Sequence, residues 1–180
     1  MVGIGRAARG GAVHLSGCFL DAKGRLVVPL VSNPTSVAAP VQPRSWLRTH
    51  NPETGKAVGV RAFDERLVGW VRVSADRTTG AFLDARRLRV GPLAGTTFQT
   101  VAEVPDPPRQ NPVVAFHPSG KWLVCGTATG VRVYETATWR EAKVLEWGAG
   151  PLEVLAFDAD GSRAAGGGTS GTVVVWDWDL

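Results

Sequence analysis

A segment of the C-terminal half of this 180-residue chain occurs twice, with a spacing of 41 residues. Val114–Gly120 corresponds to Leu155–Gly161, and each copy continues into a small-residue run, a turn with glycine and an alternating run ending in an aromatic and an acidic residue. The residues that define the pattern are Phe116, Gly120, Tyr134, Phe157, Gly161, Trp176 and Asp177. A unit of this length cannot bury its apolar surface alone, so copies of it must stack on one another.

The pattern extends toward the N-terminus in weaker form. Val71–Arg77 lies 43 residues before the Val114 segment, and Cys18–Gly24 begins a similar unit. Short extended runs alternate with Gly, Pro, Asn and Asp, and no window of 12 or more residues has helical periodicity. We therefore expect an all-β fold of about four antiparallel four-stranded blades, forming a partial or minimal β-propeller or another stacked array.

The repeat also divides the chain into units. We expect an N-terminal tail, two degenerate blades, one blade of the repeat type and a last blade that ends at its third strand. The corresponding ranges are 1–12, 13–60, 61–104, 105–147 and 148–180.

Residues 112–180 closely resemble the WD-repeat family, whereas residues 13–104 resemble it only in outline. The stretches that carry the resemblance are Ala156–Gly161 and Gly171–Asp177. The resemblance implies propeller blades, and it implies a buried polar set that this chain lacks. Gly148-Ala149 stands at the usual Gly-His, and Thr129 and Ser170 stand where a turn Asp is usual. The motif residues are structural, so the resemblance transfers no functional residue to this chain.

The length raises the question of whether this chain forms a whole propeller ring. Propellers have 4 to 8 blades, and WD-repeat rings usually have about seven. A chain of 180 residues supplies about four units. It is therefore a minimal ring, one half of a homodimeric ring, or part of a protein with further blades upstream of Met1, and the third reading is the one we expect.

The composition narrows the class of protein. Hydrophobic residues make up 44% of the chain and charged residues 20%, as in a globular protein. No apolar run is long enough to span a bilayer. The two cysteines, Cys18 and Cys125, and three scattered histidines give neither a disulfide framework nor a metal cage. We predict no metal, cofactor or catalytic residue, a buried Cys125, and a surface position for His117 in its turn.

The charge is uneven along the sequence. Residues 1–90 contain 14 Lys and Arg against 6 Asp and Glu, and residues 91–180 contain 6 against 10. The tight basic cluster is Arg86, Arg87 and Arg89. It lacks interleaved aromatic residues that would stack on bases, so nucleic-acid binding is disfavoured. The predicted binding residues are Arg86, Arg87, Arg89, Arg109 and Trp147. Trp147 lies in a connection between two blades, so packing between blades is its other role and the one we favour.

The N-terminus contains one targeting pattern. Leu15-Ser16-Gly17-Cys18 resembles the cleavage box of a bacterial lipoprotein. The segment before it holds two Gly and a His where a signal peptide needs a run of 7–15 apolar residues. The sequence therefore predicts a cytoplasmic protein, with export as the alternative.

These observations favour a non-catalytic scaffold whose loops and rim bind other proteins. Two alternatives stay open because a fold does not fix a function. The chain could be a sensory or regulatory segment of a larger multidomain signalling protein. It could also be a propeller enzyme or ligand binder with a site in a central channel.

Overall fold

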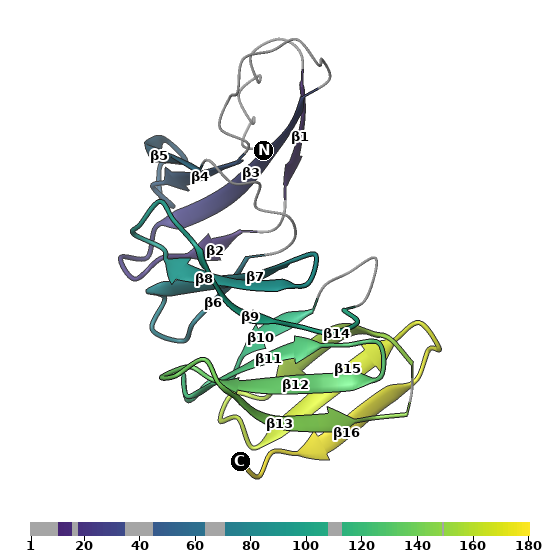
Figure 1. Ribbon diagram of the computed structural model, residues 1–180. Helices are drawn as coiled ribbons and strands as arrows, with labels where there is room; N and C mark the ends of the chain where they lie inside the picture. The colour runs from purple at the N-terminus through teal and green to yellow at the C-terminus, as the bar shows by residue number, and fades with distance from the viewer. Residues whose placement is uncertain (1–10, 16–17, 35–44, 64–70, 108–112, 149) are drawn as a thin grey trace.

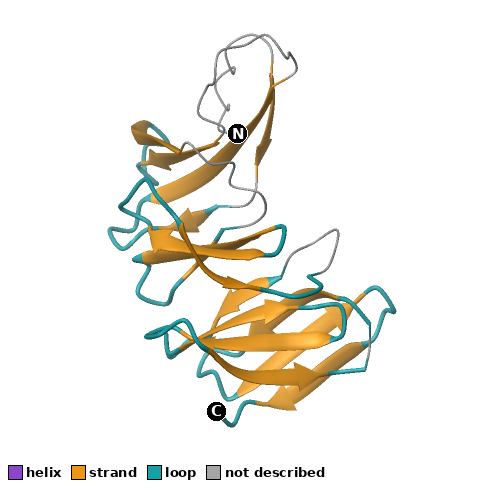
Figure 2. Ribbon diagram, in the orientation of Figure 1, coloured by secondary structure: helices purple, strands orange, loops and turns teal. Residues whose placement is uncertain are grey.

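The computed structural model describes residues 11–15, 18–34, 45–63, 71–107, 113–148 and 150–180 (Figure 1). These residues form strands, turns and loops without a helix, which confirms the all-β prediction (Figure 2). The part of the chain described here accordingly has no helix of the length and hydropathy needed to cross a membrane.

The described strands form four antiparallel sheets, each made from consecutive segments of the chain. The first sheet comprises β1 (Gly11–Leu15), β2 (Phe19–Leu20), β3 (Leu26–Pro34), β4 (Ser45–His50) and β5 (Ala57–Phe63). The second comprises β6 (Arg72–Val73), β7 (Thr79–Asp84), β8 (Arg87–Pro92) and β9 (Gln99–Glu103). The third comprises β10 (Val114–Phe116), β11 (Trp122–Gly126), β12 (Gly130–Glu135) and β13 (Glu141–Glu146). The fourth comprises β14 (Leu152–Phe157), β15 (Arg163–Gly168) and β16 (Val173–Asp177).

The same tight turn joins the first two consecutive strands of the last three sheets, and it also joins β2 to β3. In each copy the fourth residue donates its backbone N–H to the first residue's carbonyl at 2.8–3.2 Å. The first and fourth residues are Asp21 and Gly24, Ser74 and Arg77, His117 and Gly120, and Asp158 and Gly161. The fourth residue has a positive φ in every copy, a conformation that glycine adopts without strain. The two weaker units of the sequence therefore contain the same turn as the two clear ones.

The sheets stack in chain order and enclose three apolar cores. The first core joins the first and second sheets through Val27, Leu47, Phe63, Phe82 and Phe98. The second core joins the second and third sheets through Leu83, Leu88, Val114, Leu123 and Tyr134. The third joins the third and fourth sheets through Val124, Val131, Val133, Leu152 and Leu155. The second and third sheets are thus covered on both faces, whereas the first and fourth lie at opposite ends of the stack (Figure 1).

The described residues form no closed ring. The fourth sheet has the strand order β14-β15-β16, so it presents three strands where the second and third sheets present four. Its last strand, β16, covers the segment that the sequence pattern predicts as the third strand of the last unit.

One sequence-based expectation about the turns is wrong. His117 was expected at the surface, but its side chain is only 6% exposed. The ring stacks on Trp178 with centroids 5.4 Å apart and meets Phe157 edge-on at 4.9 Å. Its Nε2 lies 2.9 Å from the carbonyl oxygen of Gly161. The turn of the third sheet is therefore covered by the fourth sheet, a contact between residues 44 positions apart that local sequence does not reveal.

Candidate functional site

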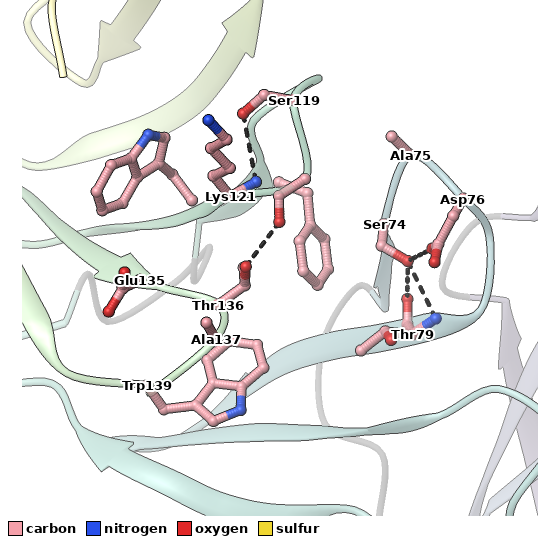
Figure 3. Close-up of a pocket in the computed structure, with 13 residues that line it drawn as sticks. Ser74, Ala75, Asp76, Thr79, Ser119, Lys121, Glu135, Thr136, Ala137 and Trp139 are labelled. Carbon is pink, nitrogen blue, oxygen red and sulfur yellow. Dashed lines mark hydrogen bonds between the residues drawn. The ribbon is translucent and has the colours of Figure 1, made fainter.

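An open pocket of about 730 Å³ lies at the edge of the second and third sheets. Three turns line it: the β6–β7 turn of the second sheet, and the β10–β11 and β12–β13 turns of the third. We call it the sheet-edge pocket, and it is lined by Ser74, Ala75, Asp76, Thr79, Phe116, Ser119, Gly120, Lys121, Trp122, Glu135, Thr136, Ala137 and Trp139. Figure 3 shows Ser74 and Asp76 on one side of the opening and Lys121, Thr136 and Trp139 on the other.

Hydrogen bonds fix the second-sheet wall of the pocket. The Ser74 hydroxyl lies 2.5 Å from Asp76 Oδ1 and accepts a bond from the Thr79 backbone N–H at 3.0 Å. Thr78 also donates to Asp76, from its hydroxyl at 2.7 Å and its N–H at 3.1 Å. The Ser74 hydroxyl first, and then Thr78, hold the pKa of Asp76 below its ordinary value by stabilising the carboxylate. Asp76 is therefore a fixed negative charge at the pocket rim.

The third-sheet wall is tied together across two turns. The Thr136 hydroxyl donates to the Gly120 carbonyl at 2.7 Å, and the Thr136 N–H donates to the Lys121 carbonyl at 2.9 Å. Trp139 has a φ of 57°, and its N–H donates to the Glu135 carbonyl at 2.7 Å. These bonds connect the β10–β11 and β12–β13 turns, so the wall is held by backbone contacts rather than by long side chains.

The pocket combines aromatic surface with charge. Phe116 and Trp139 are half-buried and contribute apolar ring surface, whereas the Trp122 ring packs against the core between the third and fourth sheets. Lys121 is exposed, and its ammonium group has no hydrogen bond to any described residue. Glu135 accepts a hydrogen bond from the Thr138 hydroxyl at 2.7 Å. Aromatic rings with a polar edge and a few oriented charges are typical of sites that bind side chains of another protein.

The predicted basic cluster does not form one surface. Arg89 is buried at 9% exposure and donates to the Phe98 carbonyl, so it does not contribute to an exposed binding surface. Arg86 forms an exposed ion pair with Asp106 at 3.0 Å. Arg87 faces Asp84 on one neighbouring strand and Glu103 on the other. Arg87 and Arg89 lie two positions apart in β8 and so share a face, but Arg89 is buried whereas Arg87 is exposed, so the three arginines do not make one exposed basic surface.

Trp147 is a core residue rather than an exposed anchor. It is half-buried in the core between the third and fourth sheets, and its Nε1 donates to the Gly150 carbonyl. Its ring covers Gly166 and Gly168 so closely that a Cβ on either glycine would come within 3.1 Å of it. The remaining candidate, Arg109, lies outside the described residues.

The repeat-motif residues have structural positions. Phe116 packs against the core of the second and third sheets, and Tyr134 is buried within it. Trp176 packs in the next core, where its buried Nε1 has no hydrogen-bond partner among the described residues. That unsatisfied N–H agrees with the loss of the polar set noted in the sequence. Asp177 is exposed and pairs with Arg163 at 3.3 Å.

Sequence reasoning did not identify the sheet-edge pocket. Its two walls come from Ser74–Thr79 and from two segments that begin at Phe116 and Glu135. The only available signal was the correspondence between the Val71–Arg77 and Val114–Gly120 segments, which predicts equivalent turns in neighbouring units. It does not predict that these turns, together with the one after β12, enclose a pocket.

Among the described residues, no group of three or more His, Cys, Asp and Glu side chains is placed to hold a metal ion. No protein-family model matches the chain, and neither does any curated protein.

Proposed function

We propose that this chain is a non-catalytic scaffold of stacked WD-type blades that binds other proteins through the sheet-edge pocket. Two features support the propeller part of the proposal. Each sheet packs on the next in chain order, and the same turn recurs in the same place in each unit. Stacking of this kind is how repeat units bury surface that a single unit leaves exposed.

The observation that carries the binding proposal is the pocket itself, where ring surface from Phe116 and Trp139 adjoins the charged groups of Asp76 and Lys121. The ligand this favours is an extended peptide segment of a partner protein. An apolar side chain of that segment would cover the rings, and polar groups beside it would reach the charged rim. Turns held by backbone hydrogen bonds lose little freedom when they bind, which favours recognition by a preformed site.

The surroundings of the charged groups favour binding over acid–base catalysis. Asp76 accepts bonds from Ser74 and Thr78, and Glu135 accepts one from Thr138, so both carboxylates are engaged within their own turns. Nucleic acid is the less favoured partner, because Arg86 and Arg87 lie beside acidic side chains and Arg89 is buried.

A peptide-display selection on the full chain tests this function. Binders selected on the unmodified chain are then measured against Ala137→Arg, which places a long side chain at the exposed rim of the pocket. We expect affinity to fall by at least about 10-fold, as for loss of an interface contact of moderate strength. The matched control is Ala159→Arg, an equally exposed alanine in the β14–β15 turn, which should leave affinity unchanged.

Two results would remove the proposal. One is a set of binders that Ala137→Arg does not weaken, or a selection that yields no binder. The other is enzymatic turnover that persists through purification and disappears when a single residue of the pocket is substituted.

A further inference from the structure

The outer face of the fourth sheet, which points away from the third, is apolar and exposed. Cross-strand register places Val154, Gly167 and Val173 in one row and Ala156, Ala165 and Val175 in the next. Directly opposed residues of an antiparallel sheet share a face, so these six form one surface. Val173 is 70% exposed and Val175 is 63% exposed. We call this surface the fourth-sheet outer face.

The third sheet shows what covers such a face. Val131 and Val133 of β12 hold the same places in the repeat as Val173 and Val175 of β16. They are 2% and 0% exposed, because the fourth sheet packs on them through Leu152 and Leu155. The fourth-sheet outer face therefore repeats the side chains on which, one unit earlier, another sheet of this protein is seated.

The first sheet also has a mainly apolar outer face, on the side opposite its core with the second sheet. Register places its members in three rows, of which two include a basic side chain: Leu20, Leu26, His50 and Ala57; Val28, Arg48 and Val60; and Leu30, Trp46 and Ala62. Leu20 and Val60 are the most exposed of its large apolar side chains, at 42% and 55%. We call this surface the first-sheet outer face.

Charge distinguishes the two end units. Residues 13–60 contain five Lys and Arg against two Asp and Glu, whereas residues 148–180 contain one against five. Contact between unlike ends brings opposite net charges together, and contact between two identical ends brings like charges together. The charges therefore favour a head-to-tail pairing of the two faces over a symmetric pairing of one face with itself.

We propose that the fourth-sheet outer face binds the first-sheet outer face of a second copy of this chain. The contact would be a fourth sheet-on-sheet interface of the kind that occurs three times within the chain. It is a heterologous contact, and two such contacts close a ring of two chains if the curvature of the stack allows. The interface is separate from the sheet-edge pocket, which lies between the second and third sheets, so it stands or falls independently of the proposed binding function.

The mass of the full chain in solution, measured by sedimentation equilibrium between about 1 and 100 μM, is the first test. We expect an assembly larger than the 19.1 kDa of a single chain. Val175→Glu and Val60→Glu each place a carboxylate on one outer face, in the edge strand of its sheet. Each should weaken assembly by about 100-fold or more, because a carboxylate in place of an apolar side chain would have to lose its hydration at the contact.

Val144→Glu is the matched control. Val144 is an exposed valine of β13, 47% accessible, and lies outside both end faces. The control should retain the assembly of the unmodified chain. Because Val60, Val144 and Val175 are all exposed, each variant should keep the unfolding transition of the unmodified chain, which is checked by urea titration.

A mixing experiment separates head-to-tail from symmetric contact. In a mixture of Val175→Glu and Val60→Glu, one chain retains an intact first-sheet face and the other an intact fourth-sheet face. Head-to-tail pairing predicts that two chains, each monomeric alone, form a 1:1 complex when mixed.

Three results would overturn the proposal. They are a monomer at 100 μM, an assembly that either glutamate variant leaves intact, and a mixture of the two variants that stays monomeric. A monomer would show that the two end faces do not bind each other in solution.

Discussion

The third and fourth sheets are built from the same repeat but differ in what covers them. Val131 and Val133 are buried, whereas their counterparts Val173 and Val175 are among the most exposed large apolar residues described. Both pairs of valines lie in equivalent strands, so the local sequence determines that these residues form a strand. Whether their side chains are buried depends on whether another sheet packs on them. The exposure of a given repeat position therefore depends on whether its sheet lies inside the stack or at its end.

The turns of these two sheets also share a backbone conformation but differ in what packs against them. Gly120 and Gly161 occupy equivalent positions with φ of 73° and 79°. Space beside Gly120 is open, but a Cβ on Gly161 would lie 2.4 Å from the His117 ring. The β14–β15 turn of the fourth sheet thus packs against the His117 ring of the third sheet. A Cβ at Gly120 would have no described neighbour within 4 Å.

The largest effect that tests the comparison is a buried charge. Val133→Glu should destabilise the chain by about 4 kcal/mol or more, because the carboxylate would be buried without a partner. Val175→Glu, at the equivalent position of the fourth sheet, should change stability by about 0.5 kcal/mol or less. Urea unfolding at a concentration where the chain is monomeric gives both values. Equal effects would contradict the assignment of the two faces.

The two cysteines give a second comparison. Cys125 lies in β11 of the third sheet and is fully buried, whereas Cys18 is exposed. Burial raises the pKa of the Cys125 thiol well above its ordinary value, so the reactive thiolate is disfavoured in the folded chain. We expect Cys125 to react with a disulfide reagent about 1,000-fold more slowly than Cys18, because labelling requires opening of the core. The rates are measured on Cys18→Ser and Cys125→Ala. Fast labelling of both would show that the third sheet is not a stable core.

The turn glycines give an effect of intermediate size. Gly161→Ala should cost about 3 kcal/mol, since it combines an unfavourable φ with a clash against His117. Gly120→Ala should cost about 1 kcal/mol from the φ alone. In a His117→Ala background the Gly161→Ala cost should fall to that of Gly120→Ala, which a double-mutant cycle measures. An unchanged cost would show that the ring does not constrain this turn.

The smallest effect concerns the exposed ion pair of the fourth sheet. Arg163 and Asp177 lie 3.3 Å apart with side chains that are 67% and 87% exposed. Arg163→Ala should change stability by about 0.5 kcal/mol or less, because solvent and salt screen exposed pairs. A thermal melt in low and high salt checks this expectation, and a loss above about 1 kcal/mol would indicate a stronger role for this edge.

Much of the local structure follows from the pattern of residues. The alternating runs after Gly130 and Gly171 became β12 and β16, and the small-residue runs before them became β11 and β15. The expectation of a buried Cys125 is confirmed. Periodicity and turn residues act within a few positions of the chain, which is why they are visible in a single sequence.

The candidate site was much less predictable. Arg89 was selected as an exposed binding residue, yet it is buried and donates to the Phe98 carbonyl. Trp147 takes the packing role between units that was set beside its role as a binding candidate, since its ring covers Gly166 and Gly168. Sequence adjacency grouped Arg89 with Arg86 and Arg87, although Arg89 is buried and Arg86 pairs with an exposed acidic residue. The pocket residues were missed because they combine turns from two units.

By itself, the sequence determined the strands, the recurring turn and the need for units to stack, because short-range geometry and the requirement to bury apolar faces are written in the residue order. The tertiary structure alone decided which faces are covered, that His117 is a core residue, and that three turns form the sheet-edge pocket. These features depend on contacts between residues about 40 positions apart, and the free energy of such contacts is set by packing between sheets rather than by any local pattern.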